Sequence, residues 1–395
     1  MFSQRTNWEL AHNRFTQAMQ DVRAAGVPVL DLTVSNPTRV GLRYDEEAIV
    51  AALSSPQLLD YDPQPKGLRQ ARNAVVAYYA DAHALPGLDP EQLVLTSSTS
   101  EGYSYVLRLL CNPGDELLVP QPSYPLFEFL ADLQDVKLLP YPLIYDHGWQ
   151  MDFHSMRKVI SPRTRGAVVV HPNNPTGSYV QPHEIGQLNS FCREFGLALI
   201  ADEVFLDFAH DGKSRASFAA NRDVLTFTLS GVSKISGLPQ MKLSWVATSG
   251  PRAQVAAAVA RLEVVADTYL SMSAPIQWAA PVLLNQRTSI QTQIMDRVLA
   301  NLEELDRQLA LQNTCQRLMV ESGWYAILRV PVTKSDEELA IELLRRRSVL
   351  VHPGHFFDFP KDGYLVLSLI TPAEEFSEGT RRLVEWVDRA KENEL

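Results

Sequence analysis

Six short apolar runs between residues 93 and 247 limit what this chain can fold into more strongly than any other feature. Each run is almost unbroken, and unbroken apolarity is typical of strands that are buried on both faces of a mostly parallel sheet. We therefore predict an α/β fold whose sheet is flanked by helices. The runs are 93–95, 116–119, 167–170, 197–200, 224–227 and 243–247.

The C-terminal part of the chain has a different pattern, which predicts a second and smaller unit. Beyond Trp324 the order strand, helix, strand, strand, helix indicates an α+β arrangement. A long amphipathic helix near 285–312 is expected to bridge the two units, and the N-terminal segment through Leu42 is expected to pack on the smaller one without a sheet of its own. The predicted C-terminal elements are 325–328, 337–347, 349–351, 364–370 and 374–393.

The length of 395 residues allows two domains, each with its own core. We place a large domain at 45–285 and a small domain at 1–44 together with 286–395. No repeats or long linkers separate them, so a tight interface between the two domains is expected.

The composition narrows the class of protein. A formal charge of −10 without a basic cluster argues against nucleic acid as a partner, because that binding needs a concentrated basic surface. No apolar run approaches membrane-spanning length and the first residues lack a secretory signal, so we expect a cytoplasmic protein with no membrane partner. Cys111, Cys192 and Cys315 are odd in number and widely spaced, which predicts free thiols and no metal site.

A lysine and a carboxylate each stand where a predicted strand ends. Lys234 follows the run that begins at Leu229, and Asp202 closes the run at 197–201. Ligands of such sheets sit beyond the carboxyl ends of the strands, so the two side chains are expected to converge. A lone lysine is more often a solvated loop residue, because lysine is rarely buried without a partner. Together, however, the pair suits pyridoxal phosphate, whose aldehyde forms an imine with lysine and whose ring accepts electrons when an acid keeps it protonated.

Two further segments at strand ends could contact such a cofactor. Residues 96–102 open a helix with small hydroxylated side chains, and the free N–H groups of a helix start suit a phosphate. An ordinary N-cap explains the same residues. Tyr124, framed by Pro122 and Pro125, could present its face to a flat ring, although a tyrosine packed in a turn is the plainer explanation.

The heptapeptide from His171 to Gly177 is more specific. Its two prolines and its glycine define a fixed turn that holds the Asn174 amide at a strand end, where it can donate to a phenolic oxygen. We interpret His171 as a turn residue rather than an acid or base.

Taken in order, these segments resemble the class I/II aminotransferases, a family of pyridoxal-phosphate enzymes of fold-type I. The resemblance covers essentially the whole chain. It implies a large domain with a mostly parallel, seven-stranded-type sheet, a smaller α+β domain and a homodimer. Tyr61 with residues 66–69 resembles the family element whose tyrosine crosses the dimer interface to bind the partner's cofactor phosphate.

The resemblance also implies roles for single residues. Lys234 matches the Schiff-base lysine, Asp202 the aspartate at the pyridine nitrogen, Asn174 the asparagine at the phenolic oxygen and Tyr124 the ring-stacking aromatic residue. Lys234 and Asp202 are therefore the predicted catalytic residues, and a lysine in a desolvated site should have a lowered pKa. The other predicted cofactor contacts are Ser98, Thr99, Ser100, Phe205, Ser233, Lys242 and Tyr61.

Three cofactor positions depart from the family pattern. Phe205 stands where a tyrosine commonly donates to the phenolic oxygen, so Asn174 would be the main partner of that oxygen. Gly231 replaces a frequent serine. Lys242 replaces a frequent arginine, which keeps the charge but loses the bidentate fork.

The largest departure concerns the substrate. Val366 occupies the place of the arginine that grips the substrate α-carboxylate, and valine cannot form a bidentate pair. Either another cation takes over, or the substrate has no carboxylate at that position. Arg39 is the first candidate and His355 the second, each with a plain alternative as a surface arginine or a turn histidine. The predicted substrate contacts are Arg39, Asn174 and His355.

The expected function is a pyridoxal-phosphate-dependent aminotransferase that moves an amino group between an amino acid or related amine and a 2-oxo acid. A lyase, decarboxylase or cyclase on the same scaffold is the alternative, because these reactions differ only in which Cα bond stands perpendicular to the ring. A third reading is a non-catalytic, cofactor-binding regulator. The intact Lys234, Asp202 and Asn174, and the absence of an attached DNA-binding domain, argue against that reading.

Overall fold

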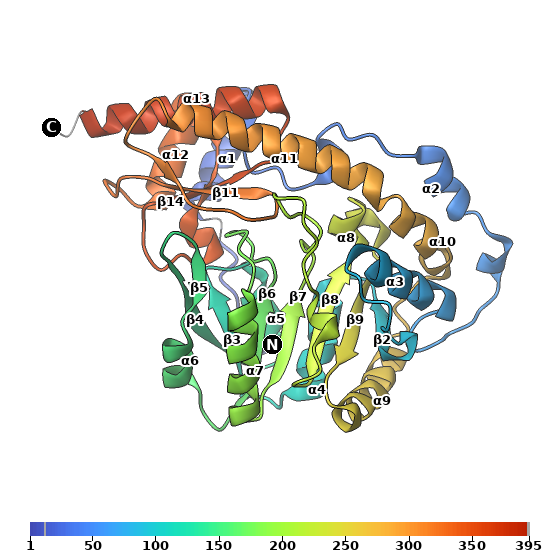
Figure 1. The fold of residues 1–395 in the computed structure, drawn as a ribbon. Helices are drawn as coiled ribbons and strands as arrows, with labels where there is room; N and C mark the ends of the chain where they lie inside the picture. Colours follow the sequence, from blue (N-terminus) through green and yellow to red (C-terminus); the bar gives the residue numbers. More distant parts are fainter. Residues whose placement is uncertain (12, 393–395) are drawn as a thin grey trace.

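The computed structural model describes residues 1–11 and 13–392, which form a large sheet with a smaller sheet above it in Figure 1. The large sheet has the strand order β2-β9-β8-β7-β6-β3-β4-β5. Neighbours among β3, β4, β6, β7 and β8 are parallel, whereas β9 is antiparallel to β2 and β8, and β5 to β4. The strands are β2 (Leu93–Thr96), β3 (Glu116–Gln121), β4 (Lys137–Tyr145), β5 (Trp149–Met151), β6 (Thr164–Val170), β7 (Ala198–Asp202), β8 (Thr226–Gly231) and β9 (Ser244–Ser249).

The predicted fold class is confirmed, and each of the six apolar runs contributes to a strand of the large sheet. The short edge strand β5 brings this sheet to eight strands, where seven were expected. All five residues of β7 are buried and all six of β8 are buried. Burial on both faces explains the unbroken apolar run of β7 up to Ala201, whereas in β8 apolar residues alternate with the buried Thr226, Thr228 and Ser230.

Helices cover both faces of the large sheet because successive side chains of a strand point in opposite directions. Val168 and Ile200 belong to a core cluster with residues of α4 (Thr99–Leu110), α5 (Leu126–Asp132) and α9 (Arg252–Tyr269). Val169 and Leu199 belong to a second cluster with residues of α6 (Phe153–Val159) and α7 (Pro182–Phe195). Near β2 and β9, a third cluster includes residues of α3 (Arg69–Ala82) and α10 (Ala274–Asn285).

The smaller unit is built on an antiparallel sheet of order β10-β11-β14-β13. Its strands are β10 (Gln316–Arg317), β11 (Tyr325–Arg329), β13 (His352–Pro353) and β14 (Tyr364–Ser368). The N-terminal segment was expected to have no sheet, but β1 (Leu30–Asp31) pairs in parallel with β12 (Val349–Leu350). The helices of this unit are α1 (Arg14–Ala24), α11 (Arg287–Leu309), α12 (Asp336–Arg347) and α13 (Ala373–Glu392).

The long helix α11 spans the top of the molecule in Figure 1, from α10 near the large sheet to α13. The expected domain boundary at 285/286 falls between α10, which ends at Asn285, and α11, which begins at Arg287. The final predicted helix corresponds to α13, and its expected last residue, Asn393, lies outside the described residues.

The remaining short elements connect these layers. Among the described residues, no helix combines the length and apolarity that a membrane crossing requires, and no group of His, Cys, Asp and Glu side chains could hold a metal ion. All three cysteines are free. The elements not yet given are α2 (Glu46–Ala52), α8 (Val232–Ile235), η1 (Gln4–Thr6), η2 (Pro37–Arg39), η3 (Pro56–Leu59), η4 (Pro90–Gln92), η5 (Phe218–Ala220), η6 (Pro239–Met241) and η7 (Gly354–Phe357).

Candidate active site

Lys234 lies in α8, the single helical turn that follows β8. Its Nζ is 4.8 Å from the ring centroid of Trp324 and 5.4 Å from that of Phe205. These two rings stand edge to face, 5.2 Å apart at 80°. Burial lowers the pKa of Lys234 to about 8, while the charge of Asp202 acts in the opposite direction. The neutral amine is therefore accessible near neutral pH, as the sequence predicted.

Asp202 ends β7, the strand next to β8, so sheet topology alone brings it toward Lys234. Its Oδ1 accepts the Val204 N–H at 3.2 Å and its Oδ2 accepts the Tyr103 hydroxyl at 3.2 Å. Burial raises the pKa of Asp202 to about 6, and these two donors and the charge of Lys234 limit that rise. The acid is thus mostly ionised at neutral pH, in a place where a cation would pair with it.

Asn174 lies in the loop between β6 and α7 and is 9% exposed. Its Oδ1 is buried and has no hydrogen-bond partner among the described residues. The neighbouring Asn173 stabilises the turn, because its Oδ1 accepts the Thr176 hydroxyl at 3.0 Å. His171 is a neutral core residue as interpreted: its Nδ1 accepts the Val180 N–H, and burial lowers its pKa to about 3.

Gly177 closes this turn against residues 320–322, the segment that leads toward β11. Its φ is +65°, and an added Cβ would collide with the Ser322 carbonyl oxygen and with Val320. We expect Gly177→Ala to lower the free energy of unfolding by about 3 kcal/mol, since left-handed backbone strain and overpacking add. Gly212→Ala is the control, because Gly212 has φ +69° but nothing within 4 Å of the added Cβ, and only about 1 kcal/mol should be lost there. Urea unfolding measures both losses, and equal losses would contradict the packing argument.

The predicted phosphate segment forms the start of α4. Ser98 is the N-cap, and its Oγ accepts the Glu101 N–H at 3.1 Å. The first intrahelical bond runs from the Gly102 N–H to the Ser98 carbonyl, so the N–H groups of Thr99 and Ser100 have no intrahelical acceptor. The plain N-cap and the anion site are therefore compatible at this helix start.

Tyr124 lies between β3 and α5 and is 44% exposed. Burial, together with the charge of Asp202, raises the pKa of its phenol. The neighbouring Ser123 donates its N–H to the Phe357 carbonyl at 2.9 Å. The loop is thereby tied to the smaller unit, which closes one side of the site.

The other predicted cofactor contacts differ in their burial. Ser233 precedes Lys234 in α8 and is half-buried. Lys242 is exposed, follows η6 and has φ +53°. Phe205 is 3% exposed and packs against Trp324, so its ring is part of an apolar wall and offers no donor.

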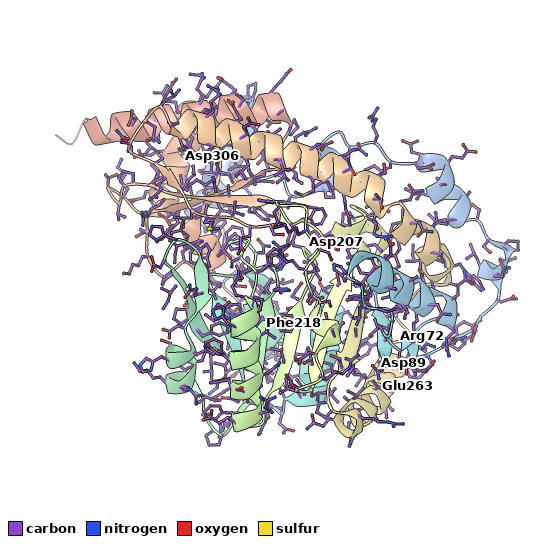
Figure 2. All side chains as sticks on the ribbon, in the orientation of Figure 1. Arg72, Asp89, Asp207, Phe218, Glu263 and Asp306 are labelled. Atoms are coloured by element: carbon purple, nitrogen blue, oxygen red, sulfur yellow. The ribbon has the colours of Figure 1, made fainter. Side chains whose placement is uncertain are left out.

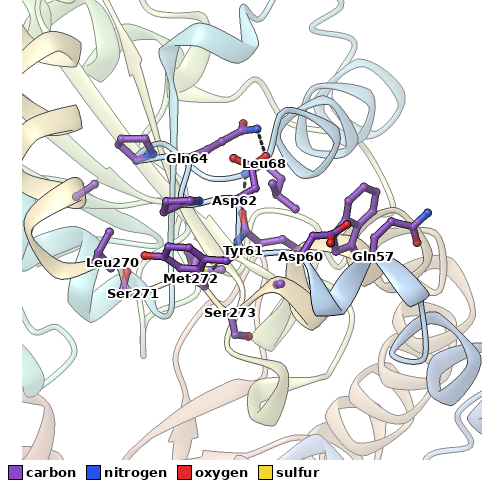
Figure 3. A pocket seen from close by; sticks show the side chains of 16 residues that line it. Gln57, Asp60, Tyr61, Asp62, Gln64, Leu68, Leu270, Ser271, Met272 and Ser273 are labelled. Carbon is purple, nitrogen blue, oxygen red and sulfur yellow. Dashed lines mark hydrogen bonds between the residues drawn. The ribbon is translucent and has the colours of Figure 1, made fainter.

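Tyr61 is not brought to Lys234 within this chain. It is 80% exposed and lines a separate cavity of about 530 Å³. Figure 3 shows Tyr61 beside Leu270, Ser271 and Met272. Lys234 is not among the residues that line this cavity.

The two candidate substrate cations, Arg39 and His355, differ in their surroundings. Arg39 is exposed at the end of η2, and its side chain forms no hydrogen bond or ion pair with the described residues. Pro37, two residues earlier, lies 3.6 Å from the Cβ position of Gly237, just beyond Lys234. His355 is exposed in η7, and its ring stands edge to face with Phe356, with centroids 4.7 Å apart.

Val366 is fully buried in β14, directly opposite Ile327 of β11. In an antiparallel pair, opposite residues share a face, and Tyr325 and Ser368 form the next such pair on that face. Tyr325 contacts Phe205 at 6.4 Å between centroids. Val366 therefore places an apolar side chain on the face of the smaller sheet that contacts Phe205.

Two residues that the sequence did not single out prove to be part of the site. Tyr103 donates to Asp202, and Trp324 lies against Lys234. Both are almost fully buried aromatic residues, so from the sequence alone they look like core residues.

A second ionisable cluster lies behind Lys234. His83 Nε2 is 2.8 Å from the Asp207 carboxylate, and Asp207 is labelled between the large sheet and α11 in Figure 2. Gln291 of α11 donates to Asp207 at 2.6 Å and to the Ile235 carbonyl at 2.9 Å. This cluster connects the turn that carries Lys234 with the bridging helix α11.

The groups that converge here suit pyridoxal phosphate. The site offers a lysine with a lowered pKa, a buried carboxylate, an amide whose oxygen lacks a partner, a partly exposed aromatic ring and a helix start with free N–H groups. A flat, phosphorylated heteroaromatic aldehyde can use the lysine, the carboxylate, the aromatic ring and the helix start, and the Nδ2 group of Asn174 offers a donor for its phenolic oxygen.

Comparisons with known proteins agree with this chemistry. The chain is 27% identical to the glutamate-pyruvate aminotransferase AlaA of Escherichia coli over 353 residues, 87% of each protein. It is 27% identical to the alanine aminotransferase of Mycobacterium bovis over 372 residues, which cover 92% of this chain and 86% of the relative. The solved alanine aminotransferase of Pyrococcus furiosus has the same fold, with a TM-score of 0.89 at 23% identity, and the match covers 98% of this chain and 100% of the other. The family model for aminotransferase class I and II matches residues 28–376, and the chain therefore belongs to the class I and II aminotransferases.

Proposed function

We propose that this aminotransferase uses pyridoxal phosphate bound through Lys234 to move an amino group from an amino acid to a 2-oxo acid. The observation that carries the proposal is the placement of Lys234 and Asp202 at the ends of adjacent strands, each with a pKa shifted by burial. When bound, the cofactor supplies an aldehyde that captures amines and a ring that accepts electrons.

Lys234 serves as the attachment point and as the proton carrier in this proposal. With a pKa of about 8, its side chain can give up and regain a proton near neutral pH, which is what a general base needs. The rings of Trp324 and Phe205 form an apolar wall beside its Nζ. Asp202 keeps the ring nitrogen protonated, since an ionised carboxylate favours the charged form of a neighbouring base.

The other predicted contacts hold the cofactor in place. The N–H groups at the start of α4, with Ser98, Thr99, Ser100, Ser233 and Lys242, bind its phosphate. Tyr124 stacks on the ring, Phe205 packs beside it, and the Asn174 amide donates to its phenolic oxygen. A homodimer is the proposed working form, in which a second copy of the chain would contribute Tyr61.

The names of the relatives guide the choice of substrates. Glutamate as donor and pyruvate as acceptor are the first pair to test, because AlaA of Escherichia coli is named a glutamate-pyruvate aminotransferase. We expect isotopically labelled nitrogen from glutamate to appear in the alanine formed from pyruvate, with no free ammonia. Release of the label as ammonia would contradict transamination.

Arg39 is proposed to hold the substrate carboxylate in place of the missing arginine at position 366. Its guanidinium has no partner among the described residues, and its loop passes the Lys234 turn at Gly237. Asn174 is the second proposed substrate contact. His355 is retained as the weaker candidate, because its ring packs against the neighbouring Phe356.

Arg39→Ala is expected to raise the Michaelis constant for the amino acid by about tenfold or more, with a smaller effect on kcat. The reason is the loss of the charge-assisted bidentate pair between Arg39 and the substrate carboxylate. Arg43→Ala is the matched control, since Arg43 is exposed four residues later. Steady-state kinetics over a range of donor concentrations measures both variants. An unchanged Michaelis constant in Arg39→Ala would remove Arg39 from the site.

A further inference from the structure

Tyr103 lies on α4 and reaches the back of the proposed site. It is 3% exposed, and its hydroxyl donates to the Asp202 Oδ2 at 3.2 Å. The other oxygen of Asp202 accepts the Val204 N–H at 3.2 Å. Each carboxylate oxygen is thus held by one donor, which fixes the plane of the carboxylate.

The position of Tyr103 is itself fixed by packing. A Cβ added to the preceding Gly102 would lie 3.0 Å from Leu229 and Val246, so α4 lies unusually close to the sheet here. The Tyr103 ring stands edge to face with Phe127, with centroids 5.3 Å apart at 73°. The hydroxyl is therefore held at one place rather than moving with a loose side chain.

While Asp202 is ionised, the hydrogen bond between Tyr103 and Asp202 can run in only one direction. Burial and the charge of Asp202 raise the pKa of the Tyr103 phenol well above 10, so the hydroxyl keeps its proton and donates. A donor to an ionised carboxylate stabilises the charged form relative to the neutral acid.

We propose that Tyr103 is a positioning residue, which keeps the Asp202 carboxylate ionised and oriented for the ring nitrogen of the cofactor. The inference rests on the proposed function, because it assigns a role to the partner of Asp202. Tyr103 does not touch the reacting atoms and acts only through Asp202.

The charges around Asp202 determine how large the effect should be. The titratable groups that interact electrostatically with Asp202 are Lys234 in α8, Tyr124 in the loop after β3 and Glu203 at the next position in the chain. Burial raises the pKa of Asp202 to about 6 even with Tyr103 present. Removing one of its two hydrogen-bond donors should raise that pKa by about one further unit.

The first experiment measures the carboxyl group directly in the apoenzyme. NMR of isotope-labelled aspartate carboxyls gives the titration of Asp202, which is assigned by the signal that disappears in Asp202→Asn. Tyr103→Phe keeps the ring packing and should shift the midpoint upward by about one pH unit. Tyr141→Phe is the control, because Tyr141 is also buried but donates to the Val168 carbonyl at 2.8 Å. An unchanged midpoint in Tyr103→Phe, or an equal shift in the control, would overturn the proposal.

The second experiment measures the affinity of the apoenzyme for pyridoxal phosphate as a function of pH. Because only the ionised carboxylate pairs with the protonated ring nitrogen, the acid limb of the affinity profile should move upward by about one unit in Tyr103→Phe. Affinity should be several-fold weaker near pH 6 and nearly unchanged near pH 8.5. A uniform loss at every pH would overturn the proposal, because it indicates general damage to the site.

A cofactor analogue separates this inference from the proposed function. In the analogue a carbon atom replaces the ring nitrogen, so Tyr103→Phe should not weaken its binding. If Asp202→Asn weakens the binding of pyridoxal phosphate and of the analogue equally, the proposed role of Asp202 fails. The titration in the apoenzyme still decides whether Tyr103 controls the ionisation of Asp202.

Discussion

Replacing Lys234 by alanine should lower kcat/KM by about 10,000-fold or more. The substitution removes the attachment point and the proton carrier together, and a positioned general base alone contributes about 100- to 10,000-fold. Among the described residues, the side chains that contact the Lys234 Nζ are the rings of Trp324 and Phe205. Neither ring carries an amine, so neither can replace the lysine. Steady-state assays with glutamate and pyruvate measure the loss.

Added small amines provide the control for this substitution. A primary amine that diffuses into the vacated space should restore part of the activity in proportion to its concentration, because it supplies the missing base. Lys137→Ala removes an exposed lysine and should leave the rate unchanged. Activity of Lys234→Ala within tenfold of the wild type would show that the chemistry takes place elsewhere.

Asp202→Asn should lower kcat by about 1,000-fold while leaving Lys234 able to bind the cofactor. The amide keeps the size of the side chain and can still accept hydrogen bonds, but it has no charge with which to keep the ring nitrogen protonated. A cofactor whose ring nitrogen carries a methyl group, and thus a permanent charge, should recover a large part of the rate.

Glu203→Gln is the matched control for Asp202→Asn. Glu203 is the next residue, is 1% exposed, and has a pKa raised to about 7 by burial. Its carboxylate accepts the Ser217 hydroxyl and the Phe218 N–H, each at 2.6 Å, so it serves the core rather than the site. A similar loss of kcat in both variants would show that the effect of Asp202→Asn is not specific to the carboxylate at position 202.

The sequence was sufficient for the parts of the fold in which local pattern and burial agree. Strands such as β7 and β8 are buried on both faces, so their apolar runs were visible without a structure. The strand β4 was missed because it contains Pro140 and Pro142 and is only partly buried. The strands β1 and β12 contribute two residues each and come from distant parts of the chain, so no local pattern indicates their pairing.

The site was predictable where a motif fixes a residue at a strand end. Asp202 ends β7, and Lys234 and Asn174 follow β8 and β6, so all three lie at the carboxyl ends of adjacent parallel strands. Tyr103 and Trp324 could not be found in this way, because a buried tyrosine in a helix and a tryptophan before a strand are ordinary core residues in a sequence. The contribution of Tyr61 stays a prediction, since it depends on a second copy of the chain.

The proposed aminotransferase reaction depends on covalent attachment of the cofactor at Lys234. Reduction of the yellow enzyme with sodium borohydride makes such an attachment permanent, and peptide mapping by mass spectrometry then locates it. We predict one pyridoxyl phosphate group per chain, on the peptide that contains Lys234. A label on any other lysine, or no label in an enzyme that transfers amino groups, would contradict the account.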